Sequence, residues 1–177
     1  MKIIYLTFAL ILFNSCNNST NTQTQQETFE STEFVFSNFS ENDFIKKPYG
    51  SVYSYSYVTN GSLQNNTKNF YSSTFITTEI RIILENGNEM TNKDIDPNPM
   101  FFGDLGGMIS GEWEPNEKAK VELETPRMTE TYFKYPIKKI FIDYIIKTTD
   151  KINKNERYEV FKTIEVTEKW KNLMSKK

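Results

Sequence analysis

The sequence predicts an all-β domain over residues 29–177, folded as a single antiparallel sandwich of about eight strands. Apolar residues recur at every second position through most of this region, which is the period of a strand with one buried face. Turn-forming residues interrupt the pattern at a spacing typical of sandwiches. No strand candidate alternates with a long helical segment, and parallel strands need such long connections, so antiparallel pairing is favoured.

Three strands are expected in the first half of the domain. The first covers residues 34–39. The second, over residues 53–58, ends at Asn60-Gly61, a pair typical of a hairpin turn because both residues tolerate positive φ. The third covers residues 76–84 and ends at a second such pair, Asn86-Gly87.

The second half begins with a predicted loop over residues 94–107, which contain two prolines and three glycines. Strands are then expected at 108–113, 118–124, 139–149 and 156–166. Residues 167–176 are expected to add one or two helical turns that place Trp170 and Met174 on the same side.

The N-terminus has the pattern of an exported protein. Lys2 provides a positive charge, and residues 3–13 are apolar apart from one threonine. A helix of this length rises about 16 Å. That is too short for a bilayer core of about 30 Å, but it suits the apolar region of a signal peptide.

Asn14-Ser15-Cys16 follows this apolar run, and the stretch resembles the lipobox of bacterial lipoproteins. Ser15 and Cys16 match the lipobox, whereas Phe13 and Asn14 depart from it. The resemblance implies that residues 1–15 are a signal peptide removed before Cys16. It also implies that this cysteine, the only one in the chain, carries fatty acyl chains such as palmitate. The expected location is the cell envelope, in the outer membrane if the cell is Gram-negative.

Residues 16–28 are expected to form a linker between the lipid and the domain. Residues 17–28 contain no apolar side chain, so they cannot offset the entropy of ordering and are predicted to be disordered. A flexible coil of this length spans about 20 Å.

The composition removes several classes of function. The net charge is −2 and the chain has only three arginines, so it lacks the basic footprint of a nucleic-acid-binding protein. The chain has no histidine and a single cysteine. These absences exclude catalysis by serine–histidine or cysteine–histidine pairs, and they exclude zinc sites built on histidine or cysteine. No cofactor is expected.

Four residues with side-chain oxygens form the candidate metal site, which would suit calcium. Asp94, Asp96 and Asn98 match the start of a calcium-binding loop, with Asp104 as a further ligand. Proline and leucine stand where that loop needs glycine and a bidentate glutamate, which excludes an EF-hand. The favoured alternative is that these residues initiate turns beside the prolines.

Two groups of aromatic residues are the candidates for a partner-binding surface. The tyrosines of the strand 53–58 either pack into the core or form an exposed aromatic platform. A second cluster lies in the expected loop before Pro136, where it either plugs the end of the sandwich or forms a contact site. The two groups are Tyr53, Tyr55 and Tyr57, and Tyr132, Phe133 and Tyr135.

Two pairs of glutamates are the only conceivable acid–base groups. Glu122 and Glu124 are two positions apart on a strand, so both are expected to point away from its apolar face into solvent. Glu112 and Glu114 flank Trp113, where they would suit a sugar stacked on the ring, although a tryptophan in such a strand is more often core.

The later half of the chain looks like immunoglobulin-like sandwich lipoproteins of unknown function. The likeness rests on Trp113-Glu114-Pro115, the strand 139–149, Asp150 and the closing strand. It implies an immunoglobulin-like sandwich and transfers no functional residue.

The sequence therefore predicts a membrane-anchored, non-enzymatic β-sandwich that binds a protein or a glycan in the cell envelope. Two alternatives stay open. A carboxylate-dependent glycan hydrolase requires a cleft with two facing carboxylates. A carrier of a small apolar ligand requires a cavity between the sheets, whereas a binding module requires a flat exposed aromatic patch.

Overall fold

The computed structural model describes residues 28–95, 108–109 and 111–176. These residues form nine strands, two α-helices and one 3-10 helix. In chain order the elements are β1 (Phe29–Glu30), β2 (Phe34–Tyr49), β3 (Val52–Asn65), β4 (Tyr71–Leu84), β5 (Glu89–Thr91), α1 (Asn92–Ile95), β6 (Met108–Ile109), β7 (Lys118–Glu124), η1 (Glu130–Lys134), β8 (Ile137–Asp150), β9 (Glu156–Glu165) and α2 (Thr167–Ser175).

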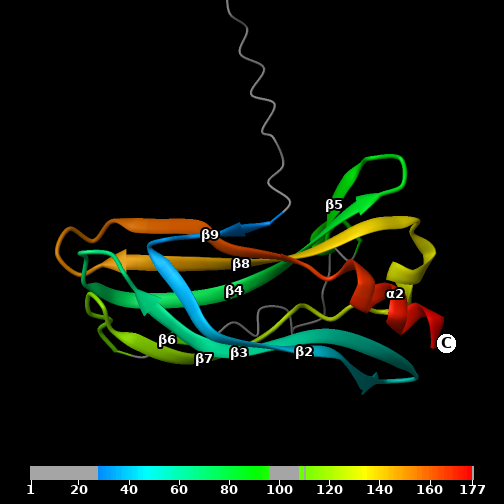
Figure 1. Ribbon diagram of the computed structural model, residues 1–177, viewed down its shortest axis with the longest axis horizontal. Coiled ribbons are helices and arrows are strands. Elements are labelled where there is room, and N and C mark those ends of the chain that lie inside the picture. The colour runs from blue at the N-terminus through cyan, green and yellow to red at the C-terminus, as the bar shows by residue number, and fades with distance from the viewer. Residues whose placement is uncertain (1–27, 96–107, 110, 177) are drawn as a thin grey trace, which may run out of the picture.

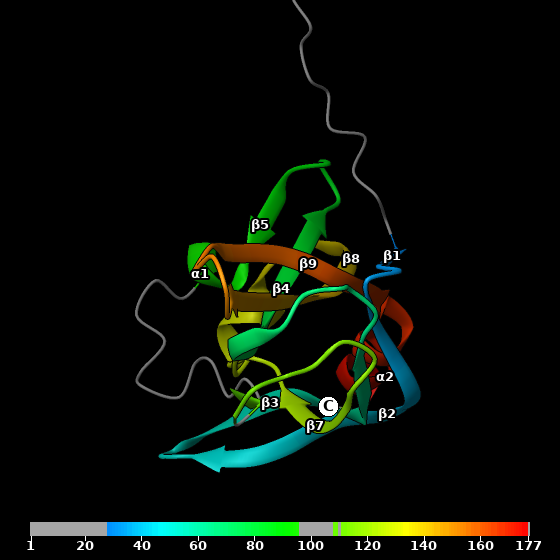
Figure 2. The same ribbon diagram turned by 90° about the vertical axis from the view of Figure 1, so that its left-hand side faces the viewer.

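The strands form two antiparallel sheets that face each other (Figures 1 and 2). The larger sheet has the order β1-β9-β8-β4-β5, and β6 also pairs with β4. The smaller sheet has the order β2-β3-β7. The prediction of an all-β antiparallel sandwich is confirmed.

The core lies between the sheets and is built by the predicted alternation. In β4, Ile76, Ile80 and Ile82 are fully buried and point to the smaller sheet. Thr78 lies on the same face, and Thr77, Glu79 and Arg81 alternate with these residues on the outer face. Ile80 pairs directly with Ile142 of β8, which is also buried. The central strands of the larger sheet therefore contribute the apolar layer that the sequence predicts.

Asn60-Gly61 is not a hairpin turn, so that prediction is wrong. The pair lies inside β3, with β2 on one side and β7 on the other. A Cβ atom on Gly61 would lie 2.7 Å from Cε2 of Phe36, so glycine is needed because the Phe36 ring covers the backbone. Asn86-Gly87 does form the predicted turn: Gly87 has a φ of +85° and its N–H donates to the carbonyl of Leu84 at 2.9 Å.

The predicted strand 108–113 is shorter in the structure. Of the described residues in this range, only Met108–Ile109 form a strand, on the edge of β4. Trp113 instead makes an isolated bridge with Tyr71, each N–H donating to the carbonyl of the other residue at 2.9 and 3.0 Å. This bridge fastens the connection before β7 to the start of β4.

One end of the sandwich is closed by α2, which lies between the layers opposite the β8–β9 hairpin (Figure 1). Trp170 of α2 is buried, and its ring packs against Phe44 of β2 at 5.6 Å between centroids. In the described part of the chain, no helix is long and apolar enough to cross a bilayer.

Candidate functional site

The tyrosine stripe of β3 belongs mainly to the core. Tyr55 and Tyr57 are almost fully buried because their side of β3 faces the larger sheet. Only Tyr53 is exposed, and the amino group of Lys46 lies 3.8 Å from the centre of its ring. The alternative of an aromatic platform is therefore wrong for Tyr55 and Tyr57.

The second aromatic cluster plugs the end of the sandwich. Tyr132 is buried in η1, while Phe133 and Tyr135 are partly buried against the core. The Phe133 ring lies 5.5 Å from Tyr55 and 5.3 Å from Trp170. The structure therefore supports a plug at the end of the sandwich and does not support a contact site.

Of the four candidate metal ligands, Asp94 is the one that lies among the described residues. Asp94 lies in α1, where its Oδ2 accepts hydrogen bonds from the Thr91 N–H at 2.6 Å and the Thr91 hydroxyl at 3.0 Å. These bonds lower the pKa of Asp94 and engage its carboxylate in the local turn. Asp96, Asn98 and Asp104 lie outside the described residues, as does Cys16. The described residues contain no group of three acidic or cysteine side chains that could hold a metal ion.

The carboxylate of Glu124 is bound by neighbouring side chains, so the expectation that it points freely into solvent is wrong. It points away from the buried Val121 and Leu123 as predicted, but its Oε1 accepts hydrogen bonds from Ser56 Oγ at 2.5 Å and Lys47 Nζ at 2.8 Å. Burial raises the pKa of Glu124, but these two donors outweigh it and lower the pKa below its ordinary value. A carboxyl group with a lowered pKa is ionised at neutral pH and is a poor general acid.

Replacing Glu124 by glutamine is expected to lower the free energy of unfolding by about 1 kcal/mol at neutral pH. Because the folded pKa lies below the ordinary value of 4.5, the carboxylate stabilises the fold above about pH 4.5. This contribution is lost as the pH falls through the lower, folded pKa. Urea unfolding at about pH 7 and about pH 3 tests this, with the exposed Glu122→Gln as control. A deficit that persists unchanged at the lower pH contradicts it.

Trp113 is a core residue and not a sugar platform. It is fully buried, and its ring stacks on Phe34 with 5.8 Å between centroids. Glu112 beside it is exposed and forms an ion pair with Lys151 at 2.6 Å.

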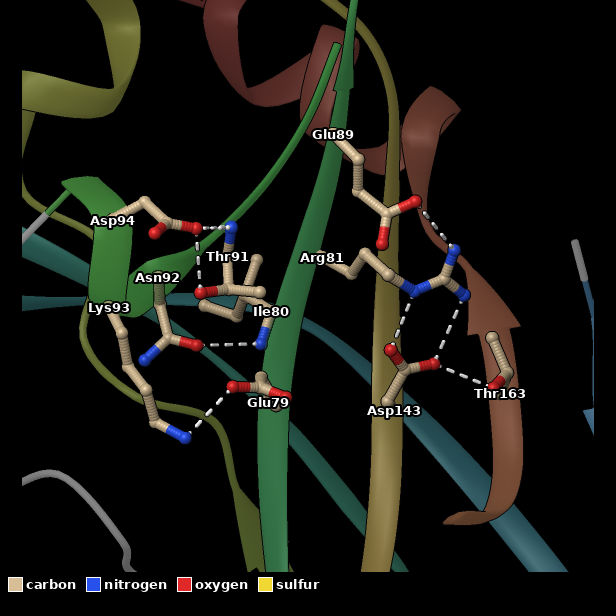
Figure 3. Close-up of polar contacts among 10 residues, drawn as sticks. All are labelled: Glu79, Ile80, Arg81, Glu89, Thr91, Asn92, Lys93, Asp94, Asp143 and Thr163. Carbon is tan, nitrogen blue, oxygen red and sulfur yellow. Dashed lines mark hydrogen bonds and ion pairs between the residues drawn. The ribbon is translucent and has the colours of Figure 1, made fainter. Parts of the chain in front are cut away.

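The outer face of the larger sheet divides into a polar half and an apolar half. In the polar half, Arg81 of β4 donates to both carboxylate oxygens of Asp143 of β8, at 2.8 and 3.2 Å (Figure 3). Thr163 of β9 donates to the same carboxylate at 2.6 Å, and Glu89 of β5 lies 4.0 Å from the guanidinium. The network thus links four strands. Burial lowers the pKa of Arg81, but Asp143 outweighs burial and raises it.

The edge of β4 beside this network is closed by the residues after β5. Oδ1 of Asn92 accepts the Ile80 N–H at 3.0 Å, and Lys93 pairs with Glu79 at 3.0 Å (Figure 3). The polar groups of this half are engaged with each other, so we assign them a structural role.

The apolar half lies toward the β8–β9 hairpin. Phe75, Lys147 and Tyr158 form one row across β4, β8 and β9, and Val160 stands in the next row. Phe75 is 45% exposed, Tyr158 65% and Val160 39%. Two loop residues at the same end, Phe70 and Ile152, are 39% and 83% exposed, and the Lys151 N–H donates to the Phe70 carbonyl at 2.7 Å. We call Phe70, Phe75, Ile152, Tyr158 and Val160 the apolar patch.

Sequence reasoning missed this patch for a definable reason. In β4, Phe75 is next to Ile76, so both faces of the strand carry an apolar residue there. In β9, a register shift opposite Tyr144 and Ile145 changes which positions face outward. The adjacent apolar residues Phe75 and Ile76, within a strand that otherwise alternates, were the signal in the sequence that could have revealed the patch.

Comparisons with known proteins leave the family open. No protein-family model and no curated protein matches the chain. Among solved structures, the crystal structure of a protein from Archaeoglobus fulgidus matches with a TM-score of 0.35 and 13% identity, covering 75% of this chain and 97% of that one. A likeness of this size carries no argument about function.

Proposed function

We propose that this chain is a lipid-anchored protein of the bacterial cell envelope whose sandwich is a non-catalytic module, and that it binds a protein partner through the apolar patch. The observation that carries the proposal is the clustering of exposed apolar side chains: five of the eight large ones among the described residues lie in this patch. Exposed apolar side chains that gather on one part of a surface are typical of interaction sites on soluble domains.

The chemistry of the patch favours a protein over a glycan. It combines two phenylalanines and a tyrosine with aliphatic Ile152 and Val160. Lys147 lies between Phe75 and Tyr158 in the same row, and its charge is paired with Glu156 at 3.0 Å. Aromatic residues are enriched and charged residues depleted at the centres of protein interfaces. The polar half beside it offers few groups to hydroxyl-rich ligands, because Arg81 and Asp143 bind each other.

The anchor is the second part of the proposal, and it rests on the lipobox resemblance at Ser15-Cys16. The domain starts at β1 on the edge of the larger sheet (Figure 2). A lipid on Cys16 would therefore connect to the domain at this edge through residues 17–28. Cys16→Ala is the separate test of the anchor: the variant should lose labelling by an alkyne fatty acid and leave the membrane fraction.

The binding test uses a photo-crosslinking residue in the full chain in bacterial cells. Placed at Tyr158, it should give a discrete crosslinked product, whereas the same residue at Tyr53, an exposed tyrosine on the other sheet, should not. Val160→Lys should abolish the product, because it puts a charge into the patch. Val52→Lys is the matched control, since both valines are 39% exposed. Equal products from Tyr53 and Tyr158, or none from Tyr158, would refute the proposed module.

A further inference from the structure

The outer edge of β9 is only partly covered. β9 covers Glu156–Glu165, but β1 pairs only with Lys162 and Thr163, and the Ser31 N–H donates to the Phe161 carbonyl at 2.7 Å. The chain then leaves for β2. Among the described residues, no strand pairs with positions 156–160 on that side. In a strand, every second residue points its N–H and C=O groups toward such an edge.

The edges of the smaller sheet carry features that discourage strand pairing. Four of the seven residues of β7 are charged, and the other edge, β2, has two register shifts and contains Pro48. Charged side chains, bulges and prolines are the usual means by which proteins protect sheet edges. The uncovered part of β9 also contains three charged residues, but Arg157 and Glu159 bind each other, and the exposed Tyr158 and Val160 lie on its outer face.

A hollow of about 300 Å³ lies between this edge and the chain that leaves β1. It is lined by β9 residues that include Arg157, Glu159 and Val160, and by residues 29–33. Arg157 binds Oε2 of Glu159 at 2.5 Å and also pairs with Glu33. Oε1 of Glu159 is buried and accepts no hydrogen bond from the described residues.

We propose that the partner of the apolar patch contributes an extended segment that pairs with β9 beside residues 156–160. The inference rests on the proposed function and names the binding mode. The segment runs antiparallel to β9, in line with β1, whose pairing shows that the edge accepts an antiparallel strand. Alternate side chains of the segment lie beside Tyr158 and Val160 and extend the apolar patch. The others face the hollow that Arg157 and Glu159 line.

Strand addition suits this site because main-chain hydrogen bonds supply affinity while alternate side chains supply specificity. A partner that only lay flat on the patch would leave the backbone groups of the β9 edge unpaired. The two binding modes therefore differ in whether the partner's own backbone N–H groups are required.

The test uses the full chain in detergent micelles and a synthetic heptapeptide with valine at alternate positions and lysine at both ends. Two N-methylated versions remove the backbone donors of one peptide edge or of the other. The parent peptide should bind, and one methylated version should lose at least about tenfold in affinity while the other does not. Amide hydrogen exchange should slow in residues 156–160. Val160→Lys should abolish binding and Val52→Lys should not.

Other outcomes overturn the inference in distinguishable ways. If both methylated peptides bind like the parent, or if protection falls outside residues 156–160, strand addition at β9 is wrong. If no peptide binds although Tyr158 still crosslinks a partner in cells, the module stands and its binding mode is different. Dimerisation of the chain that Val160→Lys abolishes would identify a second copy as the occupant of the edge.

Discussion

Replacing Asp143 by alanine is expected to lower the free energy of unfolding by about 3–5 kcal/mol, the usual cost of removing one partner of a buried ion pair. The side chain of Asp143 is 9% exposed and that of Arg81 is 14% exposed, so the substitution leaves a guanidinium with little water around it. It also removes the acceptor of the Thr163 hydroxyl. Because these residues come from three adjacent strands, the loss falls on the centre of the larger sheet.

Two controls separate the buried charge from the lost contacts. The double variant Arg81→Met with Asp143→Leu removes both charges and should recover most of the stability, because an apolar pair of similar volume leaves no unpaired ion. Lys147→Ala on the same face removes an exposed ion pair with Glu156 and should cost less than about 1 kcal/mol. Urea unfolding measures all three. A double variant as unstable as Asp143→Ala would show that the charge is not the cause.

Replacing Trp113 by alanine is expected to cost about 3–5 kcal/mol, the range for removing a buried large aromatic side chain. The indole is fully buried against Phe34 and Tyr71, with ring centroids 5.8 and 6.2 Å away. Its removal leaves a cavity at the end of the core opposite α2.

The matched variant is Trp113→Phe. The indole Nε1 is buried and donates no hydrogen bond to the described residues, so phenylalanine removes a polar group that gains nothing. Trp113→Phe should therefore cost much less than Trp113→Ala, since a ring still fills most of the space. Thermal or urea unfolding decides this. Equal losses in the two variants would indicate that the indole N–H has a hydrogen-bond partner.

The strands of the sandwich were predictable because their signal is local. A strand with one buried face needs an apolar residue at every second position, and this pattern can be read without knowing its neighbours. It located β7 at its observed bounds and put Ile80 and Ile142 in the core. The resemblances to lipobox proteins and to immunoglobulin-like lipoproteins remain predictions.

The two Asn-Gly pairs show where local signals fail. Asn86-Gly87 turns the chain between β4 and β5, whereas Asn60-Gly61 continues straight through β3. The dipeptides are identical, so the difference comes from strands distant in sequence. β7 pairs beside Gly61, and the Phe36 ring of β2 lies over it.

The sequence by itself determined the fold class, because the period of apolar residues follows from backbone geometry and the burial of one face. Only the tertiary structure decided which aromatic side chains remain exposed. Tyr55 and Tyr57 are buried because the larger sheet lies over them, and Phe75 and Tyr158 share a patch because β8 aligns their strands. These contacts join segments far apart in the chain, and strand register, which the alternating pattern does not specify, sets which residues meet.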